Sequence, residues 1–164
     1  MTSGARPAYA ARAGIVLDQA AAELFERTYR EGMDLVAEAS GYLDGAGRLE
    51  ARRLSREAAA DYVAESMRLT TRLMQVSSWL LVQKSVRDGE TAAEVAAAPR
   101  YRLAAHKTAR LSSRLPETLT GLSRRIDRLY ERVSRMDRQM YVEVEAPANP
   151  VASQLDRLRS AFAG

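Results

Sequence analysis

The side chains that could do chemistry in this chain are few and scattered. His106 is the single histidine, and the chain has no cysteine. A metal site gathers several histidine, cysteine or carboxylate ligands, and a histidine base needs a second group that orients it. Neither arrangement accompanies His106. The sequence therefore offers no catalytic, cofactor-binding or metal-binding residue, and we expect a protein that is not an enzyme and has no cofactor.

The nearest approach to a reactive cluster is a set of charged residues on one face of a predicted helix. Glu65, Arg68 and Arg72 are spaced by three and four residues, so their side chains can form ion pairs along that face. An ion pair at a surface or interface is the more ordinary role for such a set than acid–base catalysis. We expect Arg68 and Arg72, together with Gln75, to be exposed and to contact partner proteins.

Positive charge is concentrated in the second half of the chain. The net charge of the whole chain is +4, whereas residues 100–138 alone carry +7. One alternative function follows, that of a basic helical regulator that binds nucleic acid. Asp127, Glu131 and Asp137 interrupt the basic face, and no nucleic-acid motif accompanies it. We therefore expect no nucleic-acid partner; such binding would weaken steeply with salt.

Apolar residues at helical spacing predict an all-α fold, a three-helix bundle with long antiparallel helices. The helices are expected at about 14–43, 56–88 and 115–141, within a bundle spanning 14–142. The third helix has apolar residues spaced alternately by three and four, which is typical of helix-on-helix packing. Ser55 can cap the second helix. Gly32, inside the first helix, indicates a bend or the close approach of another helix.

The second helix carries more apolar surface than one neighbour can cover. One broad stripe, expected in the core, holds Tyr62, Val63, Met67, Leu69, Leu73, Met74, Val76, Leu80 and Leu81. The opposite side holds Trp79, Val82 and Val86, which predicts a homodimer face there. The alternative is that residues 91–113 fold over these three side chains.

Two terminal segments lie outside the predicted bundle. Residues 1–13 are small and polar and are expected to form a flexible arm, and residues 143–164 a flexible tail with a short amphipathic segment. In that segment Leu155, Leu158 and Phe162 share one helical face. So short a helix is marginal alone in water, so these residues are candidates for partner binding. The longest apolar run is far too short to span a membrane, so we expect a cytoplasmic protein without a membrane partner.

Three sequence runs resemble a known family. They are ESMRLTTRLMQ at residues 65–75 followed by WLL at 79–81, YLDG at 42–45 followed by GR at 47–48, and LYERV at 129–133. Together they resemble the signature of the alphaproteobacterial RcdA family, the regulators of CtrA degradation. The resemblance covers about residues 24–88 and 115–138.

The resemblance, rather than composition or spacing, implies a specific role. It implies a dimeric three-helix bundle that acts as an adaptor of regulated proteolysis. Such adaptors help the ClpXP protease degrade cell-cycle regulators such as CtrA. They work with a receiver-domain adaptor (CpdR-like) and a cyclic-di-GMP-binding adaptor (PopA-like), and recruitment to a cell pole would fit this role.

Overall fold

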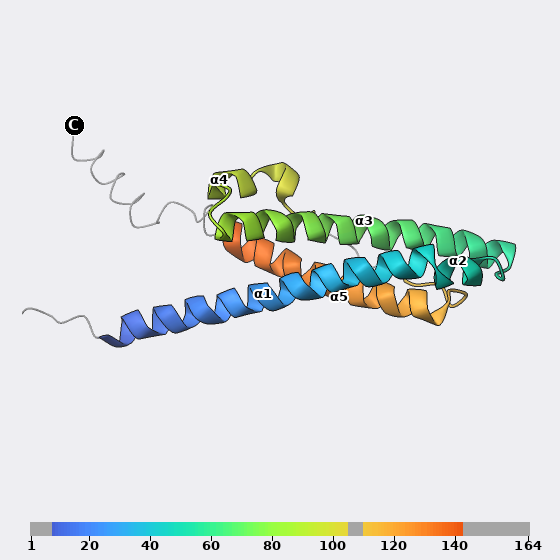
Figure 1. Cartoon of the computed structure of the whole chain (residues 1–164), viewed down its shortest axis with the longest axis horizontal. Coiled ribbons are helices and arrows are strands. Elements are labelled where there is room, and N and C mark those ends of the chain that lie inside the picture. The colour runs from blue at the N-terminus through green and yellow to red at the C-terminus, as the bar shows by residue number, and fades with distance from the viewer. Residues whose placement is uncertain (1–7, 105–109, 143–164) are drawn as a thin grey trace, which may run out of the picture.

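The computed structural model describes residues 8–104 and 110–142, and within these ranges the regular structure is entirely helical. Three long helices form a bundle, with short helices at one end and along one side (Figure 1). The elements in chain order are α1 (Ala8–Asp44), α2 (Ala46–Ala51), α3 (Arg56–Arg87), α4 (Ala93–Ala96), the 3₁₀ helix η1 (Pro99–Tyr101) and α5 (Glu117–Val142). The predicted all-α bundle of three long helices is confirmed.

The direction of the helices differs in one respect from the antiparallel arrangement expected from sequence. α1 runs antiparallel to both other long helices, but α3 and α5 run in the same direction (Figure 1). Arg72 pairs with Asp127 and Gln83 with Tyr141, so the two helices advance together. The connection between them is long enough to return along the bundle, as crossover connections do in other helical bundles.

Local signals explain most of the helix boundaries. The Ser55 hydroxyl accepts a hydrogen bond from the backbone N–H of Ala58 and caps α3 as predicted. α1 begins at Ala8 rather than at residue 14. Residues 8–13, which were expected to belong to a flexible arm, are therefore helical. α2 begins directly after α1, with Gly45 between the two helices, and occupies part of the stretch between the first two predicted helices.

The core lies where the three long helices meet. The alternating apolar positions of α5 are buried from Leu119 to Val133, as heptad spacing predicts. Gly32 of α1 allows the close approach that its position indicated. A Cβ atom there would lie 2.6 Å from Leu80 Cδ1 of α3, which is closer than packed atoms come.

The predicted core stripe of α3 is confirmed in part, because five of its residues are buried: Tyr62, Leu69, Leu73, Val76 and Leu80. Trp79 is 1% exposed and packs beside Phe25 of α1, with ring centroids 6.5 Å apart. It lies in the core, which corrects the expectation that it forms part of a dimer face. Four members of the predicted core stripe are instead 50–68% exposed: Val63, Met67, Met74 and Leu81. The reason is that α5 packs on the side of α3 that carries Arg72 and Trp79.

Candidate interaction surfaces

A cluster of charged residues joins α3 to α5 near the middle of the bundle. Arg72 pairs with Asp127, and Arg68 pairs with Glu65, which lies one turn earlier. Arg68 also lies 3.6 Å from the Asp127 carboxylate. Hydrogen bonding to Glu65, and secondarily the nearby negative charges, raises the pKa of the Arg68 guanidinium. Arg72 and Asp127 are both buried, so this cluster holds the two helices in register.

This packing corrects one predicted partner-binding residue. Arg72 is 7% exposed and its charge is used within the chain, so it is not the exposed polar group that we expected. Gln75 is exposed and Arg68 is partly so. Both line a shallow hollow of about 510 Å³ on the outer face of α3, beside Met67. These two residues therefore remain accessible to a partner.

A second polar cluster connects three segments near the end of the bundle where α3 and α5 finish. Asp137 of α5 accepts a hydrogen bond from Trp79 Nε1 at 2.8 Å and pairs with Arg102 Nε at 2.9 Å. The Arg102 guanidinium stacks over the Tyr141 ring at 4.3 Å, and Tyr141 accepts a hydrogen bond from Gln83. The connection after η1 is thereby fastened to α3 and α5.

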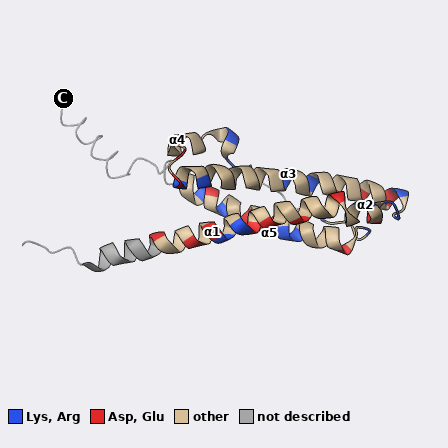
Figure 2. Cartoon of the chain, in the orientation of Figure 1, with Lys and Arg blue, Asp and Glu red and all other residues tan. Residues whose placement is uncertain are grey.

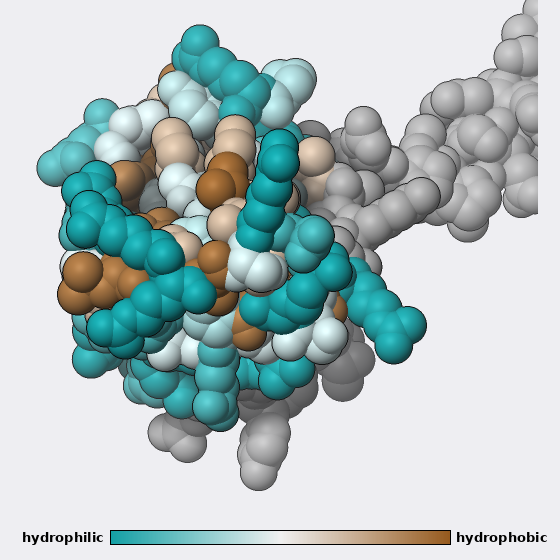
Figure 3. Space-filling view, turned by 90° about the vertical axis from the view of Figure 1, so that its right-hand side faces the viewer, coloured by the Kyte–Doolittle hydropathy of each residue, from teal (hydrophilic) through white to brown (hydrophobic). Residues whose placement is uncertain are grey.

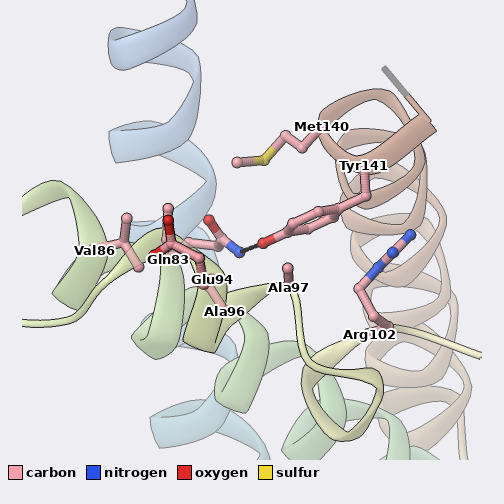
Figure 4. Close-up of a pocket in the computed structure, with 9 residues that line it drawn as sticks. Gln83, Val86, Glu94, Ala96, Ala97, Arg102, Met140 and Tyr141 are labelled. Carbon is pink, nitrogen blue, oxygen red and sulfur yellow. Dashed lines mark hydrogen bonds between the residues drawn. The ribbon is translucent and has the colours of Figure 1, made fainter. Parts of the chain in front are cut away.

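A cavity of about 540 Å³ lies beside this polar cluster, between the ends of α3 and α5 and the short helix α4 (Figure 4). Val86 of α3 lines it, together with Ala96 and Ala97 from α4 and its end. Val82 and Val86 are half-buried. The segment after α3 thus folds over part of the predicted dimer face, which is the alternative that the sequence left open.

The exposed apolar face of the bundle lies instead between α1 and α3. A groove of about 470 Å³ runs between these helices, with Met33 and Val36 on one wall and Met74 and Leu81 on the other. Val36, Met74 and Leu81 are 38%, 65% and 50% exposed. Large exposed apolar patches on a folded domain mark contact sites, so this groove is a candidate interface. Two of its exposed residues, Met74 and Leu81, were predicted from the sequence to lie in the core.

The excess positive charge of α5 faces the acidic side of α1. Arg125 of α5 pairs with Glu38 of α1 at 2.6 Å, and Arg132 pairs with Glu31. Charges of both signs therefore lie side by side along these helices (Figure 2). This pairing compensates part of the basic segment, and no observation favours nucleic-acid binding by it.

Several predicted residues lie outside the described part of the chain. These are His106 and the three apolar tail residues, Leu155, Leu158 and Phe162. Among the residues that the structure does describe, no group of three or more His, Cys, Asp or Glu is arranged to hold a metal ion. Within the same residues, no helix is both long and apolar enough to cross a membrane.

The chain is similar to proteins of one family. Residues 16–162 match a family model described as protein of unknown function (DUF1465). Among solved structures, RcdA from Caulobacter crescentus CB15 matches with a TM-score of 0.63 and 55% sequence identity. The match covers 73% of this chain and 92% of that one. None of the curated proteins matches the chain.

Proposed function

Because this chain belongs to the RcdA family, we propose that it is a non-enzymatic adaptor of regulated proteolysis. It helps to deliver cell-cycle regulators such as CtrA to the ClpXP protease. The observation that carries this proposal is the 55% identity to RcdA over 92% of that chain. The role belongs to the cytoplasm, with recruitment to a cell pole.

The proposed mechanism is tethering. One surface of the adaptor binds cargo while another binds the protease complex through its CpdR-like and PopA-like partners. Two weak contacts then act together, because the second contact forms at a high effective concentration. The mechanism requires accessible surfaces rather than reactive groups, and the side of α3 that carries Arg68 and Gln75 supplies one.

The apolar tail is a further proposed cargo contact. Leu155, Leu158 and Phe162 share one helical face in sequence, and a short segment of this kind suits weak, switchable docking. Deletion of residues 146–164 should abolish cargo binding while leaving the thermal unfolding of the bundle unchanged. Unchanged cargo affinity after the deletion would remove the tail from the proposal.

Self-association is also proposed, through the groove between α1 and α3. Met74 and Leu81 are seven residues apart on the exposed side of α3, and both line the groove; this is the spacing of helices that pack against one another. Two copies meeting on this face would form a two-fold interface in which each groove receives the partner's α3.

A binding experiment with purified proteins tests the adaptor role before any degradation assay. The chain, ClpX, the receiver-domain adaptor and CtrA are mixed pairwise and all together, with the cyclic-di-GMP-binding adaptor and its ligand present throughout, then separated by size-exclusion chromatography. We expect CtrA to elute with ClpX only when this chain and the receiver-domain adaptor are both present. Elution of CtrA with ClpX to the same extent without this chain would contradict the proposal.

A further inference from the structure

The short helix α2 is held rigidly against the end of the bundle. Tyr42 of α1 donates a hydrogen bond from its hydroxyl to Glu50 Oε2 of α2 at 2.6 Å. Gly47 lies so close to Tyr62 that a Cβ atom at residue 47 would be 2.5 Å from the Tyr62 hydroxyl oxygen. The orientation of α2 is therefore fixed, and Arg48 lies one turn before Arg52, the residue that directly follows α2, so both lie on the same side.

A hollow of about 420 Å³ lies between α2 and the first turns of α3. Part of its wall is apolar, and two of its apolar side chains, Val63 and Met67, are 56% and 68% exposed. Ser66 also lines the hollow, and its buried hydroxyl has no hydrogen-bond partner among the described residues. Because a methionine side chain adapts its shape to a neighbour, Met67 can move aside to admit a ligand group.

Two arginines line the same hollow, Arg48 of α2 and Arg52, which directly follows α2. Within the described chain Arg52 forms no ion pair, and Arg48 pairs only with Asp44, at 3.9 Å with both side chains at least 70% exposed. Such a pair contributes little. The carboxylate of Glu50 is occupied by Tyr42. The positive charge at the hollow is therefore largely uncompensated by the chain itself.

The view onto this end of the molecule agrees with these properties. Apolar side chains extend from the left edge of the face to its centre, and long hydrophilic side chains lie around and across them (Figure 3). Exposed Leu49 of α2 adds apolar area at this end of the bundle. An apolar centre with a charged rim is the usual anatomy of a protein interface.

We propose that this hollow binds an acidic protein segment in which carboxylates flank an apolar side chain. The carboxylates pair with Arg48 and Arg52, since guanidinium groups bind carboxylates in a two-pronged geometry. The apolar side chain enters the hollow between Val63 and Met67. This site is independent of the adaptor role and does not require the protease.

The test uses a fluorescein-labelled peptide in which glutamates flank a single leucine, with binding followed by fluorescence anisotropy. We expect saturable binding to the full chain, weakened about tenfold or more by Arg48→Glu or Arg52→Glu. Arg53→Glu is the matched control, because it changes the net charge equally but does not line the hollow. Val63→Ser should also weaken binding without changing the charge. Circular dichroism confirms that each variant is folded.

Three outcomes would overturn the proposal. The first is no binding of the peptide. The second is that Arg52→Glu and Arg53→Glu weaken peptide binding equally, or that a peptide with alanine in place of leucine binds with equal affinity. Either result would show that binding depends on a general attraction between charges and not on the hollow. The third is preferential binding of phosphatidylglycerol vesicles or of duplex DNA, because the site would then serve an anionic surface of another kind.

Discussion

Trp79 of α3 donates its indole N–H to the Asp137 carboxylate of α5 at 2.8 Å, and both side chains are buried. The same carboxylate pairs with Arg102, which follows η1. One aspartate therefore holds three segments that are far apart in sequence. Its negative charge also contributes, after burial, to raising the pKa of Tyr130.

Replacing this carboxylate should destabilise the bundle markedly. Asp137→Ala leaves the Trp79 N–H and the Arg102 guanidinium without their acceptor, at a cost of about 3 kcal/mol. Glu38→Ala is the matched control, because the pair between Glu38 and Arg125 is exposed on both sides and should contribute less than about 1 kcal/mol. Urea unfolding followed by circular dichroism measures both. Equal losses for the two variants would contradict the assignment.

Two helical glycines should respond to alanine with opposite signs. Gly32→Ala places a Cβ atom 2.6 Å from Leu80 Cδ1 in the core, and the overpacking, about 1–3 kcal/mol, should outweigh a gain in helix propensity of about 1 kcal/mol. A Cβ atom at Gly121 meets nothing within 4 Å, so Gly121→Ala should stabilise by about 1 kcal/mol. Thermal unfolding compares the two variants. Stabilisation by both would show that α1 and α3 are not in close contact at Gly32.

Alkaline pH should weaken the attachment of α2. Burial, and then the hydrogen bond to Glu50, raises the pKa of Tyr42 above its ordinary value of 10.0. The folded state thus favours the neutral phenol. The resulting stabilisation is complete below pH 10 and is lost as the pH rises beyond it.

Tyr42→Phe tests this pH dependence. The variant should lose about 1 kcal/mol at neutral pH, and its stability should fall less steeply than that of the unmodified chain above pH 10. Some fall should remain, because the pKa of Tyr130 is raised as well. The measurement is the free energy of unfolding on either side of pH 10. Identical slopes for the two proteins would contradict the account of Tyr42.

The groove between α1 and α3 should control self-association. Met74→Glu and Leu81→Glu each place a charge in the apolar groove, and burying an unpaired charge in an interface is costly. We expect a dimer for the unmodified chain and a monomer for each variant by analytical ultracentrifugation. Leu24→Glu is the control, since Leu24 is exposed but does not line the groove. Dissociation by Leu24→Glu, or dimers throughout, would exclude this interface.

Sequence periodicity predicted the three long helices because it reports which residues are apolar and how they are spaced. It did not predict which side of α3 meets α5. Both sides carry apolar residues, and the choice depends on Arg72 and Trp79 finding Asp127 and Asp137 on another helix. The direction of α5 was missed for a similar reason, because the return path of the connection depends on tertiary contacts such as that of Arg102.

The candidate surfaces were harder to predict than the helices. Arg72 lies one helical turn after Arg68 on the same face, so the sequence pattern does not separate the two. Only the packing of α3 against α5 shows that Arg72 is buried. α2 is short and polar, and the contact of Gly47 with Tyr62 has no periodic signal. A sequence clue was nevertheless present, since Leu49 follows Arg48 and precedes further arginines in one short stretch.

The most direct measurement of the central claim is the rate at which ClpXP degrades CtrA in a purified system. The receiver-domain adaptor, the cyclic-di-GMP-binding adaptor and its ligand are supplied in every reaction, with and without this chain. The adaptor account predicts faster loss of CtrA when the chain is present, and a return to the basal rate when residues 146–164 are deleted. An unchanged rate of CtrA loss on adding the intact chain would contradict the account.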